Sequence, residues 1–276
     1  MIRLSDEARQ HIALFEDVTG VAARDCIVAR ESPDARVVFV VPPEGMADAI
    51  GPGGRTVSTL EERLGTAVEL VEDADTAEAF VANALRPAAV YEVTVRDRER
   101  DGETERVAYA EVDADDFGAA IGAGGKNVAM AARLAERHHG VDAIELVPDP
   151  DSALETVTEA TDVEPVDVVF DAVDERLLVL VPSGTSGAVG SRADALTSRL
   201  GWPVEVVTYA GNAAELIENA LAPAEVYNVT VSQSGVAYAE VDHEDRGLAI
   251  GRGGTRIRRA RLLAARYYGV DDVELT

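Results

Sequence analysis

The two halves of this chain repeat each other. The segment NALRPAAVY at residues 83–91 recurs as NALAPAEVY at residues 219–227, an offset of 136 residues (219 − 83). Gly122 corresponds to Gly251 at an offset of 129 residues (251 − 122), so a hairpin between the two matches is seven residues shorter in the second half. Internal repetition of this kind predicts copies of one small fold rather than a single large domain.

A glycine-rich segment recurs within the repeat. An apolar residue, Gly-x-Gly-Gly, a polar pair and then Val or Ile follow one another at residues 50–57, 121–128 and 250–257. Glycine lets the backbone approach another group closely, and the N–H groups at a helix start favour an anion. One such segment is a weak signal, because the same residues build ordinary turns. Three copies in matching positions predict a phosphate-binding loop.

The spacing of apolar residues predicts an α+β fold made of modules in the order α-β-β-α-α-β. In the second module, strands at 90–95 and 107–112 flank a charged segment, 96–106, which we predict to be a solvated loop. Pro148–Asp151 is predicted to be a linker between the halves. The expected modules are residues 1–73, 74–148, 149–210 and 211–276.

The third module departs from the pattern. Ser191–Asp194 stand where the other modules have the glycine loop, and Gly184–Gly187 form a Gly-x-x-Gly that lies too early in the alignment. We predict that this module keeps the fold and binds no ligand. For Trp202 at its end, the sequence leaves open an apolar contact with a neighbouring module or a platform on which a base stacks.

The charge balance is strongly acidic. Asp and Glu number 51 against 25 Lys and Arg, for a net charge of −26, and Lys126 is the single lysine. With strands rich in Val and Ile, this composition indicates a folded protein with a carboxylate surface of the kind found in salt-in halophilic archaea. Acidity repels nucleic acid, so any binding face must be locally basic. Six Arg and no acid lie between Gly251 and Gly269, which makes that segment the basic exception.

Other features narrow the class of protein. Cys26 is the single cysteine, which excludes an internal disulfide and fits a reducing cytoplasm, and we expect neither a signal peptide nor a membrane span. His138-His139 could suggest a metal site, but Tyr267-Tyr268 occupy the matching positions, so contacts at a helix end are expected. Without a Walker lysine motif or a catalytic set, we expect a non-catalytic protein that needs no cofactor.

The recurring α-β-β-α-α-β pattern with its glycine loops resembles the type II KH domain. Two tandem pairs of such modules resemble the NusA-like family of archaeal transcription termination and elongation factors, whose short members consist of one KH pair. The resemblance covers nearly the whole chain, and it implies binding of nascent single-stranded RNA, with RNA polymerase as a further candidate partner. A KH loop clamps the backbone of about four nucleotides. The residues expected to contact RNA are Gly51, Pro52, Gly53, Gly54, Arg55, Gly122, Ala123, Gly124, Gly125, Lys126, Gly251, Arg252, Gly253, Gly254, Arg256 and Arg259.

The loops are not expected to bind equally. Local charge predicts the strongest binding at the fourth module, then the second, then the first, where Glu61 and Glu62 follow the loop, and none at the third. Two other functions stay open at this stage. One is RNA binding in ribosome assembly or RNA folding, and the other is a nucleotide-binding enzyme that uses the glycine loops.

Overall fold

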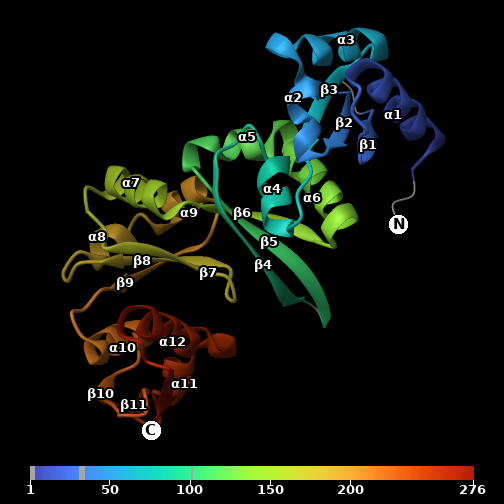
Figure 1. Ribbon diagram of the computed structural model, residues 1–276. Coiled ribbons are helices and arrows are strands. Elements are labelled where there is room, and N and C mark those ends of the chain that lie inside the picture. Colours follow the sequence, from blue (N-terminus) through green and yellow to red (C-terminus); the bar gives the residue numbers. More distant parts are fainter. Residues whose placement is uncertain (1–3, 31–34, 101) are drawn as a thin grey trace. The chain divides into compact units, whose positions relative to one another are not determined.

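The computed structural model describes residues 4–30, 35–100 and 102–276 (Figure 1). The first half contains α1 (Asp6–Thr19), β1 (Asp25–Ala29), β2 (Arg36–Val41), α2 (Met46–Ile50), α3 (Arg55–Leu64) and β3 (Ala67–Glu72), then α4 (Ala77–Ala84), β4 (Val90–Arg100), β5 (Glu103–Val112), α5 (Phe117–Ile121), α6 (Lys126–His139) and β6 (Ala143–Pro148). The order α-β-β-α-α-β predicted for each module is therefore present twice in this half.

The second half has the same order. It contains α7 (Pro150–Thr161), β7 (Asp167–Asp171), β8 (Arg176–Val181), α8 (Ser186–Gly190), α9 (Ala193–Leu200) and β9 (Val204–Thr208), then α10 (Ala213–Leu221), β10 (Val226–Val231), β11 (Val236–Val241), α11 (Arg246–Ile250), α12 (Thr255–Tyr268) and β12 (Asp272–Leu275). The chain divides into two compact units, Met1–Leu146 (unit one) and Val147–Thr276 (unit two). The predicted α+β architecture of KH-like modules in two tandem pairs is confirmed.

Each module has a three-stranded sheet of the same topology. The first two strands are antiparallel, and in the first, third and fourth modules the third strand lies parallel to the second. The middle strands β2 and β8 are buried along nearly their whole length. Strands that are apolar on both faces, as in Val37–Val41 and Leu177–Val181, need a covering layer on each side. One layer comes from the module's own helices and the other from the next module.

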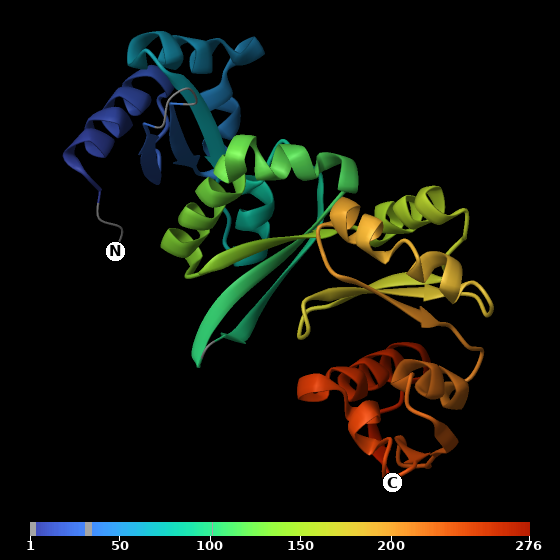
Figure 2. The ribbon, with the colours of Figure 1, turned by 180° about the vertical axis from the view of Figure 1, so that it is seen from behind.

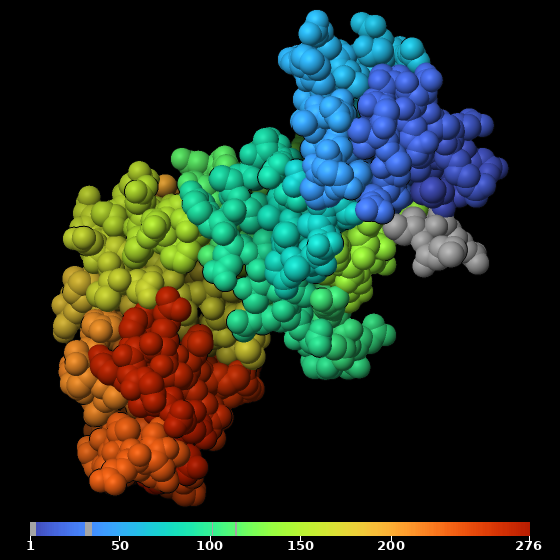
Figure 3. All heavy atoms as spheres, viewed as in Figure 1, coloured from blue at the N-terminus to red at the C-terminus, as the bar shows by residue number. Residues whose placement is uncertain are grey.

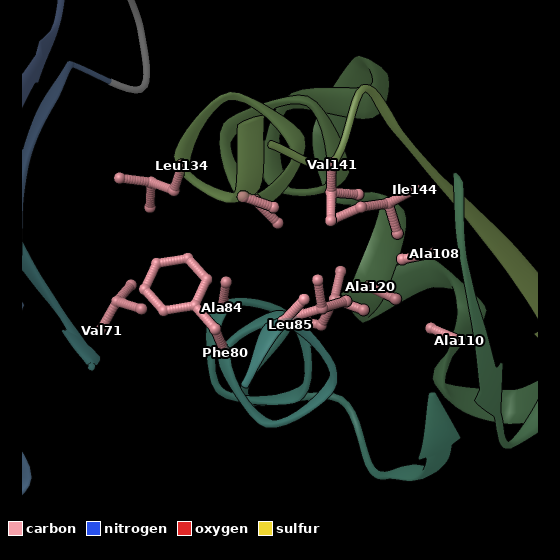
Figure 4. Close-up of a cluster of buried hydrophobic side chains, with 14 of the residues drawn as sticks. Val71, Phe80, Ala84, Leu85, Ala108, Ala110, Ala120, Leu134, Val141 and Ile144 are labelled. Carbon is pink, nitrogen blue, oxygen red and sulfur yellow. The ribbon is translucent and has the colours of Figure 1, made fainter. Parts of the chain in front are cut away.

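In unit one, the sheet of the first module packs on the helices of the second. Val38, Val40 and Val71 share one buried cluster with Phe80 of α4 and Leu134 of α6 (Figure 4). Alternate residues of β2, such as Phe39, point instead to the first module's own core. The space-filling view shows the first module, in blue, lying directly against the second, in teal and green (Figure 3). The two modules therefore share a core.

Unit two is built in the same way. Leu178 and Leu180 of β8 lie in one buried cluster with Leu216 of α10 and Leu263 of α12. Viewed from behind, α7 and α9 cover the opposite face of this sheet (Figure 2). Trp202 packs edge-on against Phe170 in the third module's own core, with ring centroids 4.8 Å apart. Trp202 therefore makes an apolar contact, as in one of the two alternatives left open by the sequence, but within its own module and not with a neighbouring one.

Two local predictions were wrong. Residues 96–106 do not form a solvated loop, because β4 and β5 continue as a long hairpin through Arg100 and Glu103. Oppositely charged residues face each other across it, and Arg98 binds both Glu105 and Glu145, at 2.8 and 3.2 Å. Pro148–Asp151 is not a linker either, because Asp149 caps α7 and Pro150 takes its first position, where proline is favoured.

Candidate nucleic-acid interface

The three glycine loops share one backbone conformation. The first glycine of each loop has φ near +70° with an extended ψ. The φ and ψ angles are 70° and 172° at Gly51, 69° and 174° at Gly122, and 75° and 170° at Gly251. The third and fourth residues are glycines in the left-handed region in all three loops. Each loop is a 3-10 turn between a five-residue helix and a longer one, closed by a 3.1 Å hydrogen bond from the fourth-position N–H to the first-position carbonyl. The sequence repeat is therefore also a repeat of geometry.

The first glycine is required by space as well as by its dihedral angles. A Cβ on Gly51 would lie 1.9 Å from Oγ1 of Thr56, and one on Gly122 would lie 2.5 Å from Cγ of Asn127. At Gly251 the nearest atoms would be 3.0 Å away. A side chain at this position would push the loop away from the helix that follows it. The turn is therefore held close to the start of α3, α6 or α12.

Each of these helices begins with backbone donors that no side chain caps. The N-caps are Gly54, Gly125 and Gly254, all left-handed and none with a side-chain hydrogen bond, and the first turns carry no acid. Helix N-termini leave N–H groups unsatisfied and carry partial positive charge, so an anion is favoured there. The first loop has one donor fewer, since Pro52 has no N–H.

The third module lacks this geometry. Of the residues between α8 and α9, Ser191 is helical, and Arg192 precedes α9 with φ −110°. Gly184 is the one glycine with positive φ in the described segment from Pro182 to Leu200. The third module therefore offers no glycine turn between α8 and α9, in front of its third helix.

Most of the predicted basic side chains lie beside the loops. Arg55 is exposed and donates from Nε to the Pro52 carbonyl at 3.1 Å, which holds it over the first loop. Lys126 is half-buried at the start of α6. In the fourth module Arg252 is exposed, and Arg256 donates to the carbonyl of Leu248 at 2.6 Å. These four cations are placed to meet an anion at their own loop.

Arg259 does not lie at the loop surface. Its side chain is 4% exposed, and its guanidinium donates to the carbonyls of Ala220 and Ala222 at the end of α10 and pairs with Glu205 of β9. Burial lowers the pKa of this guanidinium, and the Glu205 carboxylate opposes that shift. Arg259 is therefore a structural residue, and we remove it from the candidate RNA-binding set. The matching residue in unit one, Met130, is uncharged. This difference was the one sign in the sequence that a charge at position 259 is not needed to bind RNA.

Three more arginines of the basic segment are also paired. Arg258 binds Asp174 at 2.5 Å, Arg266 binds Asp167 at 3.3 Å, and Arg261 binds Asp272 at 2.6 Å. Asp167 and Asp174 belong to the third module. Among the described residues, only Arg252 and Arg256 of the six arginines form no ion pair. The absence of acids along the sequence therefore overstates how basic this surface is.

Several known proteins and one protein family are similar to this chain. The family described as NusA-like second KH domain matches twice, at residues 77–147 and 213–272. A Halococcus morrhuae protein named probable transcription termination protein NusA is 54% identical over 145 residues, which are 52% of this chain and 98% of that protein. This chain belongs to the NusA-like KH family. A protein of the same name from Methanocaldococcus jannaschii is 30% identical over 146 residues, covering 53% of this chain and 75% of its own length.

A further relative and a solved structure are also similar to this NusA-like chain. A Halobacterium salinarum protein of the same name is also 54% identical over 145 residues and is matched over 98% of its length. A crystal structure titled as that of APE1850 has a TM-score of 0.44 and 35% sequence identity, over 52% of this chain and 99% of that one. Relatives from halophilic archaea agree with the acidic, lysine-poor composition of this NusA-like chain.

His138 and His139 of this NusA-like chain lie at a helix end, as predicted. His138 contacts Asp25 of β1, and the His139 ring lies 4.9 Å from that of Phe80. No group of three His, Cys, Asp or Glu side chains suited to a metal occurs in the part of the chain that the structure describes. Within the same residues, no helix has both the length and the apolar content to cross a bilayer.

Proposed function

We propose that this chain binds nascent single-stranded RNA through its first, second and fourth glycine loops and acts, without catalysis, in transcription termination or elongation. The observation that carries the proposal is the threefold recurrence of one loop geometry at an uncapped helix N-terminus with a basic side chain beside it. The names of the relatives, which are probable transcription termination proteins, support the transcriptional role.

The chemistry at each loop follows from the groups present. Backbone N–H groups and the helix dipole face a phosphate, and Arg55, Lys126, Arg252 or Arg256 neutralises it. An isoleucine precedes every loop and is partly exposed: Ile50 by 42%, Ile121 by 39% and Ile250 by 41%. An apolar side chain next to a phosphate clamp gives the adjoining base a surface to pack on. None of these contacts reads a base edge uniquely, so the clamp itself favours single strands of many sequences.

The ion pairs change the order in which we expect the loops to rank by strength of RNA binding. Four arginines of the fourth module are committed to carboxylates, which leaves Arg252 and Arg256 for RNA. Arg133 lies exposed on α6 about two helical turns beyond the second loop. Arg30 and Arg36 approach that loop from the first module. We therefore expect the second loop to bind most strongly, then the fourth and then the first, with none at the third.

Paired substitutions in one loop at a time test the proposal. The changes are Ala123→Asp with Gly124→Asp, Arg252→Asp with Gly253→Asp, and Pro52→Asp with Gly53→Asp. Two carboxylates at the middle positions repel phosphate. A Cβ at Gly53, Gly124 or Gly253 meets no atom within 4 Å, but φ is near +60° at all three positions, so the aspartate there also strains the loop backbone. We expect the second-loop pair of substitutions to weaken RNA affinity by about tenfold. Each lost phosphate contact should also reduce the slope of log affinity against log salt concentration (the salt slope) by about 0.7.

The matched control is the third module. Thr185→Asp with Ser186→Asp adds the same charge to a Gly-x-x-Gly that lies at the start of α8 and not between α8 and α9, so affinity should stay within about twofold of the parent. If all three loop pairs bind RNA as the parent does while remaining folded, the glycine loops are not the RNA clamp. Crosslinking in cells, with sequencing of the bound RNA and identification of co-purified proteins, separates a role on nascent transcripts with RNA polymerase from one in ribosome assembly.

A further inference from the structure

A groove of about 490 Å³ lies between the two modules of unit one. One wall is the sheet edge of the first module, including Val28 and Arg30, and the other is the second glycine loop with the start of α6. Ala129 and Met130 of α6 form part of its apolar surface. This volume falls within the range of about 300–1,000 Å³ that is typical of small-ligand sites. The groove adjoins the loop but is formed by two modules, so it is distinct from the clamp of either one.

The groove is basic on a chain that is otherwise acidic. Each ionisable residue that lines it in the described part of the chain is Arg or Lys, including Arg30, Lys126 and Arg133. Arg30 is bound at 2.5 Å by Glu7, but both side chains are exposed, and an exposed pair contributes little. Arg36 is held by Glu69 at 2.9 Å. On a protein of net charge −26, apolar walls with a basic rim match a base with its phosphate.

Unit two fills the same position with its own side chains. Ala129 and Met130 correspond to Arg258 and Arg259, and Arg36 corresponds to Arg176. Arg258 binds Asp174 of the β7–β8 turn and donates to the carbonyl of Gly253 at 2.6 Å, while Arg176 reaches the carbonyl of Thr255 at 3.0 Å. The third module thus ties down the fourth glycine loop from the side that is open in unit one. The two units have the same fold but differ in this inter-module space.

We propose that the groove in unit one binds a nucleotide of the RNA strand held by the second glycine loop. Its base packs between Val28 and the Ala129–Met130 surface, where the Met130 thioether gives a favourable contact to an aromatic ring. Its phosphate lies between Arg30 and Arg133. This inference rests on the proposed RNA binding and extends it, because it continues the strand from one module onto the sheet edge of its neighbour.

Protection of a thiol placed in the groove tests this proposal on the full chain in molar KCl. The natural thiol does not interfere, because Cys26 is buried and its burial raises the pKa to about 12. Ala129 is exposed and helical, so Ala129→Cys should fold. Alkylation by iodoacetamide is timed without RNA and with a mixed-sequence single strand of about 12 nucleotides, longer than the about four that one loop holds. At about ten times the Kd, we expect alkylation at position 129 to slow by about tenfold.

The control variant is Glu136→Cys, an exposed position on the same helix outside the groove. Its alkylation rate should not change on RNA addition. Equal protection at both positions, or none at position 129 while the RNA is retarded by the protein, would overturn the groove assignment and leave RNA binding intact. Protection by AMP alone but not by RNA would make the ligand a free nucleotide and also overturn the proposal. Absence of any RNA retardation would instead defeat the proposed function itself.

Discussion

Asp25 and His138 join the two modules of unit one through a buried contact of 3.1 Å between Oδ2 and Nε2. Asp25 is fully buried at the start of β1, accepts the Cys26 N–H at 2.8 Å, and also binds Nε of Arg137 at 3.1 Å. In unit two, Asp167 takes the place of Asp25 and accepts from Tyr267 and Arg266. Both units therefore use a strand-start aspartate to hold the end of the neighbouring module's long helix.

Removal of this carboxylate should destabilise unit one. Asp25→Ala leaves Arg137 and His138 without their buried partner, and breaking a buried pair costs about 3–5 kcal/mol. We expect a lower midpoint in urea unfolding followed by circular dichroism in molar KCl. Asp48→Ala, at an exposed position of α2, is the charge-matched control and should stay within about 0.5 kcal/mol of the parent. Equal stability of the two variants would show that the Asp25 contact does not couple the modules.

Stability should also depend on the protonation of His139. Burial and the charge of His138 lower its pKa below the usual value of 6.5, against the opposing effect of Asp73. Because the folded state favours the neutral imidazole, the unfolded chain binds the proton first as pH falls. The stabilisation is therefore complete above about pH 6.5 and is lost progressively below it.

The substitution that tests this is His139→Tyr, which copies Tyr268 of unit two. The Tyr268 hydroxyl donates to the carbonyl of Ala210, the residue that matches Ala74 beside His139. Urea unfolding between pH 7.5 and 5.5 should show a shallower loss of stability in this variant than in the parent. His243→Gln changes an exposed histidine and should keep the slope of the parent. An unchanged slope in His139→Tyr would assign the acid sensitivity to other groups.

Repetition made much of this molecule predictable from sequence. The repeat of the two halves predicted four modules, and the matched glycines predicted the positions of three loops, because only glycine fits a left-handed turn packed against the next helix. The middle strands were recognisable from apolar runs such as Val37–Val41. The second covering layer that these strands need was not predicted, and the structure shows that the next module supplies it.

The sequence did not show which charged side chains form ion pairs with one another. An arginine row without neighbouring acids reads as a basic patch, but Asp167, Asp174 and Glu205, which neutralise three of its members, lie far away along the chain. The hairpin extension at residues 96–100 and 103–106 was missed for a related reason. Its strands carry no apolar alternation, and they are recognised only by charges that pair across the two strands.

Folding should require high salt. The excess carboxylates, which give a net charge of −26, repel one another in the folded chain. Salt ions screen this repulsion, because the Debye length falls from about 10 Å at 0.1 M to about 3 Å at 1 M. We expect helical circular dichroism and the thermal midpoint to rise together as KCl is raised from low to molar concentration. Sucrose at equal osmolarity adds no screening and should not replace the salt. A native spectrum with an unchanged midpoint at low salt would rule out the requirement.

The basic segment of the fourth module should separate into structural and RNA-binding arginines. Arg259→Met introduces the residue that unit one has at this position, and it leaves the carbonyls of Ala220 and Ala222 without their buried donor. We expect it to lower the free energy of unfolding by about 3 kcal/mol while RNA affinity stays within about twofold. Arg252→Met changes an exposed side chain, so stability should move by less than about 0.5 kcal/mol while RNA affinity falls and the salt slope flattens by about 0.7. Parallel urea unfolding and RNA titrations over a range of KCl concentrations measure the stability, the RNA affinity and the salt slope of each variant. A folded Arg259→Met variant that loses as much RNA affinity as Arg252→Met would mean that the Arg259 guanidinium leaves its buried site to reach the RNA.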